Sequence, residues 1–288
     1  MMHLFRKHEP ISVAGARVLV TGAGRGIGLA TAKRLVASGA RVGLGDLDAD
    51  TAHAAARSLG ERAFAAHLDV RDPASFAAFV AEGEVRMGAV DVLVANAGVM
   101  PLGPFVDERD EVSRLTLDVN VWGLVVGLRA VLPGMLARGH GHVVNVASMA
   151  GKVPLPGMAV YNASKFAAVG LSEAVRREVA GSGVTVSCVM PSAVRTELAS
   201  GVPLDRGMPT IEPGEVAEAI VGTFRTRAPE VAVPRVLAGW DMLNAIVPRA
   251  LVDAALRALG DRRAIEELDP EGRRAYASRL ARQAAPTR

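Results

Sequence analysis

Eight residues near the amino end, TGAGRGIG at Thr21–Gly28, constrain the fold more than any other part of the sequence. They follow a short apolar run and stand directly before a stretch of helical composition. Gly22 permits a tight turn, Gly26 lets the backbone approach a ligand closely, and Gly28 allows a helix to pack closely on a strand. The free N–H groups and the dipole at the start of such a helix favour an anion. The segment therefore predicts a strand–turn–helix unit that binds the pyrophosphate of a dinucleotide.

Short apolar runs alternate with alanine-rich helical stretches along residues 1–234. Such runs are typical of strands whose two faces are both buried in a parallel sheet. The expected strands are 17–21, 41–46, 63–68, 91–95, 142–147, 184–190 and 230–234. The expected helices are 26–38, 49–59, 73–87, 107–138, 158–180 and 213–227. This order predicts an α/β protein with a doubly wound parallel sheet, a Rossmann-type dinucleotide-binding domain, in residues 1–234.

Two regions interrupt the alternation. Residues 192–211 are rich in Pro, Gly and Ser, and a loop of this length in a compact domain is usually a lid or a binding loop. Residues 235–288 are expected to form a C-terminal helical extension. Its first part, 236–259, is apolar at helical spacing. This part is expected to cover the substrate cleft or a subunit contact rather than a membrane surface, because cationic residues are sparse in it. The charged part from Asp261 onward is expected to be partly mobile.

Composition argues against several classes of protein. Lys and Arg number 33 and Asp and Glu 30, a formal net charge of +3, so no dense cationic patch for nucleic acid is expected. One cysteine, Cys188, closes no intrachain disulfide, and the six histidines lack metal-ligand spacing, so the chain is expected to be cytoplasmic and to bind no metal. The most apolar segment, 119–128, ends at Arg129. It is shorter than the about 18 uncharged residues of a membrane helix, so no transmembrane segment is expected.

Asp46 closes the second expected strand, 18 residues beyond Gly28. A carboxylate there accepts both hydroxyls of an adenosine ribose and repels a 2′-phosphate, which favours NAD over NADP. Arg25 argues mildly the other way, since a cation in the glycine loop could hold that phosphate. Asp46 carries more weight because its charge would face the phosphate directly. Considered alone, Asp46 is equally typical of an ordinary turn at the end of a strand.

A second motif, YNASK, places Tyr161 and Lys165 on one face of an expected helix. The ordinary pKa of a tyrosine hydroxyl, near ~10, makes it a poor base at neutral pH. A lysine ammonium one turn away stabilises the phenolate and lowers that pKa. Ser148 ends the preceding strand. Asn120 lies inside the preceding long helix, where an asparagine is unfavourable and therefore indicates a specific role. The pair alone is also typical of a solvated helix face, but the whole set predicts an acid–base site.

Together these motifs resemble the short-chain dehydrogenase/reductase family, in its soluble Rossmann-fold branch of about 250 residues. The resemblance covers about residues 14–234. The motifs that carry it are TGAGRGIG, LDV at Leu68–Val70, NAG at Asn96–Gly98, Asn120, Ser148, Tyr161 and Lys165. The chain departs from the family pattern at Ala95, where a second Asn is frequent, and at Ser192, where Gly is frequent.

The resemblance implies that Tyr161 is the general acid/base and that Lys165 lowers its pKa and binds the nicotinamide ribose. It implies that Ser148 polarises the substrate carbonyl and that Asn120 holds a proton-relay water near Lys165. Asp69 and Val70 would contact adenine. The complete set of expected cofactor contacts is Gly22, Arg25, Gly26, Ile27, Gly28, Asp46, Leu47, Asp69, Val70, Asn96, Ala97, Gly98, Tyr161, Lys165, Pro191, Val194 and Thr196, the last three at the nicotinamide carboxamide.

These observations predict an oxidoreductase that transfers a hydride between NAD(H) and a secondary alcohol or ketone. An apolar pocket wall favours an apolar substrate. The expected wall residues are Met149, Val153, Pro154, Leu155, Pro156 and Met158, between Ser148 and Tyr161, and Met100, Pro101 and Leu102 near the nucleotide loop. One alternative is an NADP-dependent reductase of 3-oxoacyl thioesters. Another is a dinucleotide-sensing binding protein without catalysis, which would be expected to lack part of the Ser–Tyr–Lys set. The resemblance also implies a homodimer or homotetramer built through the helices at 107–138 and 158–180.

Overall fold

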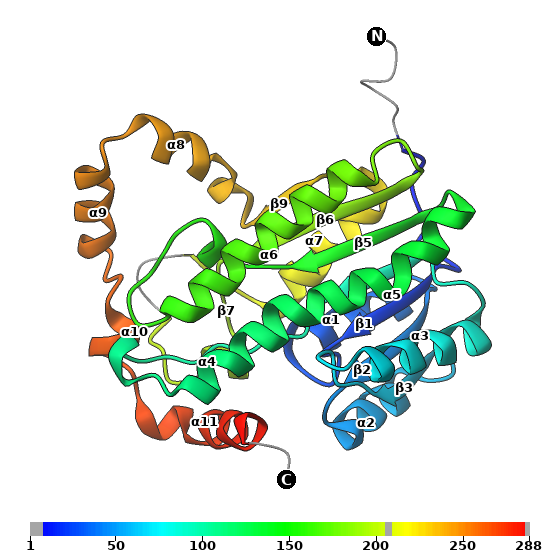
Figure 1. Cartoon of the computed structure of the whole chain (residues 1–288), viewed down its shortest axis with the longest axis horizontal. Coiled ribbons are helices and arrows are strands. Elements are labelled where there is room, and N and C mark those ends of the chain that lie inside the picture. The colour runs from blue at the N-terminus through cyan, green and yellow to red at the C-terminus, as the bar shows by residue number, and fades with distance from the viewer. Residues whose placement is uncertain (1–7, 205–208, 286–288) are drawn as a thin grey trace.

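The computed structural model of the chain describes residues 8–204 and 209–285. Seven parallel strands form one sheet in the order β3-β2-β1-β4-β5-β6-β9 (Figure 1). They are β1 Arg17–Thr21, β2 Arg41–Asp46, β3 Ala63–His67, β4 Val92–Ala95, β5 Gly141–Val146, β6 Val184–Pro191 and β9 Glu230–Val233. Every predicted strand is present, and no bound differs by more than one residue. The predicted doubly wound fold is confirmed.

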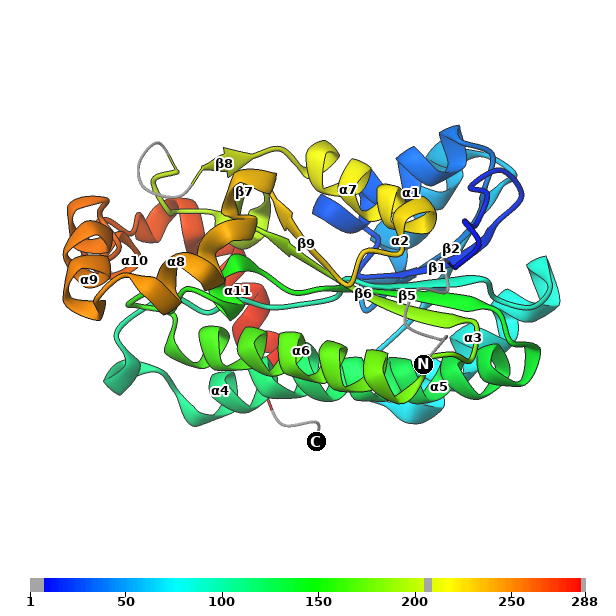
Figure 2. The ribbon, with the colours of Figure 1, turned by 90° about the horizontal axis from the view of Figure 1, so that it is seen from above.

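Helices cover both faces of the sheet (Figure 2). One layer holds α1, α2 and α7, and the other holds α3, α4, α5 and α6. Their bounds are α1 Gly26–Ala37, α2 Ala49–Leu59, α3 Pro73–Met87, α4 Asp110–Leu117, α5 Gly123–Arg138, α6 Ala159–Glu178 and α7 Pro213–Thr226. Because successive strand residues point to opposite faces, Val18 and Val20 enter the core beneath α1 and α7, whereas Leu19 enters the core beneath α3 and α5.

The long helix predicted at 107–138 contains a π-helical turn, η2 Asp118–Trp122, between α4 and α5. The continuous helix Asp110–Arg138 is long and apolar enough to cross a membrane by length and composition alone, and 44% of its most apolar window is buried. In the sequence, only the uncharged run 119–128 was considered as a membrane span, so the full helix was not weighed as one. Its apolar side contacts β5 and α3, which explains that composition without a membrane.

Short elements connect the sheet to the region of the predicted lid. These are η1 Phe105–Asp107, η3 Met149–Gly151, β7 Ala193–Val194, η4 Glu197–Ala199 and β8 Thr210–Ile211. The predicted loop 192–211 thus holds a small two-stranded sheet, β7–β8, and one helical turn, while its residues 205–208 lie outside the described part of the chain.

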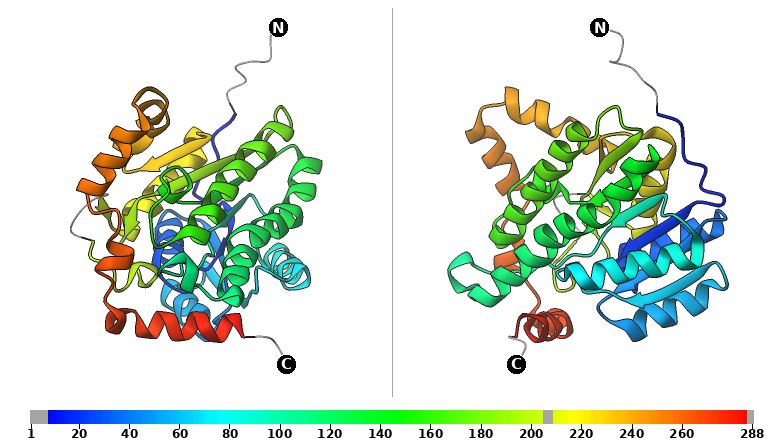
Figure 3. Two further views of the ribbon diagram at one scale, coloured as in Figure 1. Left: turned by 60° about the vertical axis from the view of Figure 1, so that its left-hand side comes forward. Right: turned by 45° about the vertical axis from the view of Figure 1, so that its right-hand side comes forward.

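The C-terminal extension is helical, as predicted. It comprises η5 Arg235–Gly239, α8 Trp240–Ile246, α9 Arg249–Ala258, α10 Arg263–Glu266 and α11 Pro270–Ala284. In Figure 3, α8 and α9 lie outside the two helical layers, and α11 runs across the opposite end of the molecule. Lys152 anchors α8 through Asp241 at 2.6 Å, and Trp240 packs beside it on the cluster around Met149.

The charged second half of the extension is helical. Within residues 261–285 it forms α10 and the fifteen-residue α11, and its expected partial mobility stays a prediction. One stripe of α11 is buried: Arg273, Tyr276 and Leu280. The charged composition hid this stripe, because its members are spaced three and four residues apart among exposed cations.

Candidate active site

The carboxyl ends of β1 and β4 are tied together at the point where the strand order reverses. The Thr21 hydroxyl accepts hydrogen bonds from the backbone N–H groups of Asn96 and Ala97, both at 3.0 Å. The Asn96 amide donates to the carbonyls of Thr21 at 3.0 Å and Gly22 at 3.1 Å. Ligands of doubly wound sheets bind in the crevice at this reversal. The bonds therefore fix the shape of a ligand-binding edge.

The glycine loop leaves space where side chains would block it. Gly22 has φ +61°, and a Cβ on it would lie 2.8 Å from the Ala97 Cα atom. A Cβ on Gly28 would lie 2.2 Å from the carbonyl oxygen of Gly22, so Gly28 serves close packing rather than ligand contact. α1 begins at Gly26, and the described residues supply neither a side-chain cap nor an acidic residue in its first turn. Its uncapped N–H groups fit a pyrophosphate.

One cavity of about 330 Å³ gathers nearly all of the predicted site residues. Those that line it are Gly22, Arg25, Gly26, Ile27, Asp46, Leu47, Asp69, Val70, Asn96, Ala97, Gly98, Ser148, Tyr161, Lys165, Pro191, Val194 and Thr196. Only Gly28 and Asn120 of the predicted set do not line it. The glycine loop and the acid–base residues therefore share one cavity.

Asp46 lies where the ribose argument placed it. Its Oδ2 atom accepts from the Gly24 N–H at 2.9 Å and its Oδ1 atom from the Asp48 N–H at 3.0 Å. Arg25 lies beside it and is bound by Asp48 at 2.5 Å and by Glu197 at 3.3 Å. Burial lowers the pKa of Arg25, but the carboxylates of Glu197, Asp48 and Asp46 outweigh this and raise it. The guanidinium is thus enclosed by acidic groups.

Asp69 reaches the cavity with its carboxylate already paired. Arg71 binds it through two side-chain nitrogens, at 2.9 Å and 2.7 Å. Burial raises the pKa of Asp69, and the hydrogen bonds and charge of Arg71 outweigh that effect and lower it. The Asp69–Arg71 pair presents both an acceptor and a donor to the cavity. The contact of Asp69 with adenine stays a prediction.

Tyr161 and Ser148 form the reactive end of the cavity. Tyr161 stands near the start of α6 and is 5% exposed. It lines the cavity together with Ser148, whose hydroxyl donates to the Pro191 carbonyl at 3.4 Å. Burial raises the pKa of the tyrosine hydroxyl to about 12, and the Ser148 hydroxyl opposes that shift. Ser148 also accepts from the Ala150 N–H at 3.1 Å, which orients its hydroxyl. The geometry suits proton transfer to or from an oxygen held between the two hydroxyls.

Lys165 lies one helical turn beyond Tyr161, with its Nζ atom 5.6 Å from the centre of the tyrosine ring. The ammonium donates to the Val146 carbonyl at 3.2 Å. Burial lowers its pKa to about 8. Lys165 is not among the groups that shift the pKa of Tyr161, so the predicted lowering of that pKa by Lys165 stays a prediction.

Asn120 sits in the π-helical turn and is 1% exposed. Its Oδ1 atom accepts from the Val99 N–H, and its amide donates to the Val99 carbonyl and to the Ser164 hydroxyl, each at 2.9 Å. Ser164 in turn donates to the Tyr161 carbonyl at 2.7 Å. The side chain therefore positions the helix that carries Tyr161, and the relay water expected near Lys165 stays a prediction.

The cavity wall is apolar, but part of it comes from a region that the sequence did not point to. Of the predicted wall residues, Met100, Met149, Leu155 and Met158 line the cavity, whereas Val153, Pro154, Pro156, Pro101 and Leu102 do not. The extension contributes Asp261, Arg263, Ala264, Tyr276, Arg279, Leu280 and Gln283. Its predicted cover, 236–259, does not line the cavity. A possible signal was available, because Tyr276 is one of only two tyrosines in the chain.

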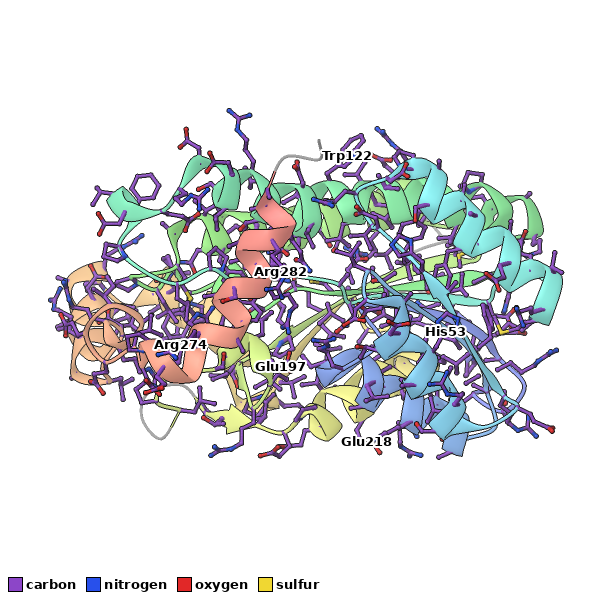
Figure 4. The ribbon with its side chains drawn as sticks, turned by 90° about the horizontal axis from the view of Figure 1, so that it is seen from below. His53, Trp122, Glu197, Glu218, Arg274 and Arg282 are labelled. Carbon is purple, nitrogen blue, oxygen red and sulfur yellow. The ribbon has the colours of Figure 1, made fainter. Side chains whose placement is uncertain are left out.

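An ion-pair bridge joins the extension to the glycine loop. Glu197 accepts from Arg279 of α11 at 2.8 Å and from Arg25 at 3.3 Å. Figure 4 shows the Glu197 segment lying beside α11. Burial raises the pKa of Glu197, but the two guanidinium groups outweigh it and lower that pKa. α11 therefore closes one side of the cavity next to the residues that would hold the cofactor.

A glycine loop at the reversal point of the sheet and a Ser–Tyr–Lys set in the same cavity define a dinucleotide-dependent oxidoreductase. Comparison with known proteins makes this class specific. The family profile described as short chain dehydrogenase matches residues 16–206. The chain therefore belongs to the short-chain dehydrogenase family, whose NAD(P)-dependent enzymes act on hydroxyl groups.

Individual relatives agree with this assignment. Estradiol 17-beta-dehydrogenase 11 of Rattus norvegicus is 33% identical over 254 residues, covering 86% of this chain and 85% of that protein. Glycine betaine reductase of Emericella nidulans is 36% identical over 239 residues, 78% of this chain, but the chain spans only 19% of that longer protein. A solved short-chain dehydrogenase/reductase from Burkholderia phymatum, in complex with NAD, is 26% identical, with a TM-score of 0.74 over 82% of this chain and 95% of that chain.

Proposed function

We propose that this chain catalyses reversible hydride transfer between NAD(H) and an apolar secondary alcohol, whose ketone is the oxidised partner. The observation that carries the proposal is that Ser148, Tyr161 and Lys165 line the same cavity as the glycine loop. The two hydroxyls flank the position of a substrate oxygen, and the loop at Gly22 and Gly26 fits a dinucleotide beside them.

The residues divide the work as follows. Tyr161 accepts the proton of the substrate hydroxyl in oxidation and returns it to the carbonyl oxygen in reduction. Ser148 donates a hydrogen bond to the same oxygen and stabilises the charge that develops on it. Lys165, whose Nζ atom lies 5.6 Å from the centre of the Tyr161 ring, would hold the nicotinamide ribose with its ammonium. The bound nicotinamide supplies the hydride acceptor.

Two features support NAD over NADP. The Asp46 carboxylate lines the cavity at the end of β2, where it would oppose a 2′-phosphate. The one cation of the glycine loop, Arg25, is enclosed by Asp48 and Glu197 and so has less attraction left for that phosphate. A short-chain dehydrogenase of similar fold was solved with NAD, which agrees with this assignment.

The substrate class follows from the wall of the cavity. Met100, Leu155, Met158, Leu198 and Leu280 give it a mostly apolar lining. Such a lining binds a hydrocarbon skeleton, and flexible methionines tolerate varied shapes. One relative carries a name that specifies estradiol, a rigid apolar alcohol. Hydroxysteroids are therefore the first substrates to test.

A screen of secondary alcohols of increasing size, with NAD as oxidant, tests the proposal. We expect Tyr161→Phe to lower kcat by about a hundredfold or more, because the general base is lost. The affinity for NADH, measured by fluorescence titration, should stay nearly unchanged. Turnover retained in Tyr161→Phe would contradict the mechanism. Oxidation of no alcohol by the wild type, together with reduction of a 3-oxoacyl thioester, would contradict the substrate class.

Cofactor preference is tested separately. We expect the wild type to have a higher kcat/KM with NAD than with NADP, and Asp46→Ser to narrow that difference by about tenfold or more, since the carboxylate no longer repels the phosphate. His53→Ser on the exposed side of α2 is the matched control and should leave the preference unchanged. A wild-type preference for NADP would overturn the ribose argument.

A further inference from the structure

A second tyrosine faces the cavity from beyond the segment that the family profile matches. Tyr276 on α11 is 5% exposed and packs with Val99, Leu115 and Leu280. It lines the same cavity as Tyr161. The matched segment ends at residue 206, so this tyrosine belongs to the chain's own extension.

The hydroxyl oxygen of Tyr276 already accepts one hydrogen bond, from the backbone N–H of Met100 at 2.8 Å. Because the N–H is the donor, the hydrogen of the hydroxyl is not used in that bond. Within residues 8–204 and 209–285 this hydrogen has no acceptor. Buried tyrosine hydroxyls normally find a partner for their hydrogen as well. The hydroxyl of Tyr276 therefore fits an oxygen atom supplied by a molecule in the cavity.

Two cations lie beside the ring of this tyrosine. The Cζ atom of Arg273 lies 4.7 Å from the centre of the Tyr276 ring, and that of Arg279 lies 5.2 Å from it. Burial raises the pKa of Tyr276, and the Met100 N–H and the two guanidinium groups offset only part of that rise. The hydroxyl therefore keeps its hydrogen at neutral pH and is available as a donor.

The donor is also fixed in place. The buried guanidinium of Arg273 donates to the carbonyls of Leu198 at 3.0 Å and Ser200 at 2.8 Å, and it is also bonded to the Met100 carbonyl. These bonds hold α11 against the segment after β4 and against η4. A rigid polar group on an otherwise apolar wall orients a ligand and selects among similar ligands.

We propose that Tyr276 is a specificity-determining residue that donates a hydrogen bond to a second oxygen atom of the substrate, other than the oxygen that reacts at Tyr161. The inference rests on the proposed function and narrows its substrate class to apolar alcohols or ketones that carry a further hydroxyl or keto group. The extension thereby selects the substrate that the family core oxidises.

A purely structural role for Tyr276 makes a different prediction. If its hydroxyl only held the Met100 backbone, Tyr276→Phe would weaken the binding of all substrates by similar factors. If it recognises an oxygen, the loss is confined to substrates that carry that oxygen. The comparison therefore needs pairs of ligands that differ by one oxygen atom.

Androsterone, which carries a hydroxyl and a keto group, and its counterpart without the keto oxygen form one such pair. A hydroxyketone of the octane series and the matching secondary octanol form a shorter pair. Dissociation constants are measured by calorimetry on the full chain with NADH bound, and kcat/KM with NAD. We expect Tyr276→Phe to weaken the binding of the oxygen-bearing member by about tenfold, which corresponds to the loss of one hydrogen bond. The binding of the other member should weaken by less than about twofold.

Arg274→Gln is the matched control on α11, because that side chain is 73% exposed and pairs only with Glu271 among the described residues. It should keep the preference, and thermal unfolding checks that both variants fold. Equal losses for both members of a pair, or no preference in the wild type, would overturn the inference. A preference in binding that Tyr276→Phe abolishes, without oxidation of any member, would support the inference and overturn the proposed function.

Discussion

Burial acts in opposite directions on the two residues of the acid–base pair. It raises the pKa of Tyr161 to about 12 and lowers the pKa of Lys165 to about 8, because each environment favours the neutral form. Tyr161 thus needs a neighbouring positive charge before it becomes a base. Lys165 is the cation one helical turn from Tyr161, and an oxidised nicotinamide would add a second positive charge to the same cavity. Binding of the oxidised cofactor and activation of Tyr161 would then be linked.

His142 on β5 allows a test of its local environment that does not depend on enzymatic activity. It is fully buried, and its Nδ1 and Nε2 atoms lie 2.8 Å and 3.0 Å from the hydroxyls of Thr185 and Thr223. Burial, with a smaller effect of Arg227, lowers its pKa to about 3. The folded state therefore stays unprotonated at His142 over a range in which the unfolded chain takes up a proton, below about pH 6.5.

We expect the free energy of unfolding to fall as the pH drops from about 6.5 toward 3, by up to about 1.4 kcal/mol per pH unit from this group. The sign follows because the unfolded state binds more protons than the folded state in that window. Urea unfolding at pH 7.5, 6 and 5 measures the slope, and His142→Gln, which does not titrate, is the comparison. Parallel slopes for the two proteins would contradict the assignment.

At the scale of elements, features that depend on local sequence were predictable, whereas features that involve contacts between distant residues were not. The strands were predictable because short apolar runs between glycine-rich turns are a local property. The π-helical turn was not predicted, and its buried Asn120 bonds to Val99, 21 residues away in the sequence. The packing of α11 was not predictable either, since Tyr276 meets Met100 across 176 residues. The motif residues of the site were predictable because each motif is a local pattern. The part of the cavity wall that comes from the extension was missed because it depends on contacts between distant residues.

The docking of α11 depends on Arg273, and Arg273→Met tests it. The variant keeps much of the side-chain volume but leaves the carbonyls of Leu198, Ser200 and Met100 without their donor, at a cost of about 1–3 kcal/mol. We expect a lower melting temperature and faster amide exchange in α11. Arg274→Met, one residue further along the same helix, should change neither. Unchanged exchange in Arg273→Met would show that the apolar contacts, the Met100–Tyr276 hydrogen bond and the Arg279–Glu197 ion pair hold α11 without Arg273.

At the scale of the whole molecule, the exposed apolar side chains of the described residues include members of two helical surfaces. The first surface is the layer of α4, α5 and α6, where Leu136 is 41% exposed and Phe166 44% exposed. The second surface is formed by α8 and α9, where Ile246 is 74% exposed and Leu251 62% exposed. Trp122, labelled in Figure 4, lies on the π-helical turn between α4 and α5 and is 43% exposed. Exposed apolar patches of this kind mark contacts between proteins.

We expect the first surface to join subunits, because it is carried by long helices fixed on the sheet, whereas α8 and α9 stand apart from both helical layers. Phe166→Glu should shift the mass in sedimentation velocity from a dimer or tetramer of the 30.0 kDa chain toward the monomer, since a charge would be buried without a partner. Leu251→Glu places the same charge on the second surface and should leave the mass unchanged. The reverse result would move the subunit contact to the extension, and the helix Asp110–Arg138 would then need another reason for its outward apolar residues.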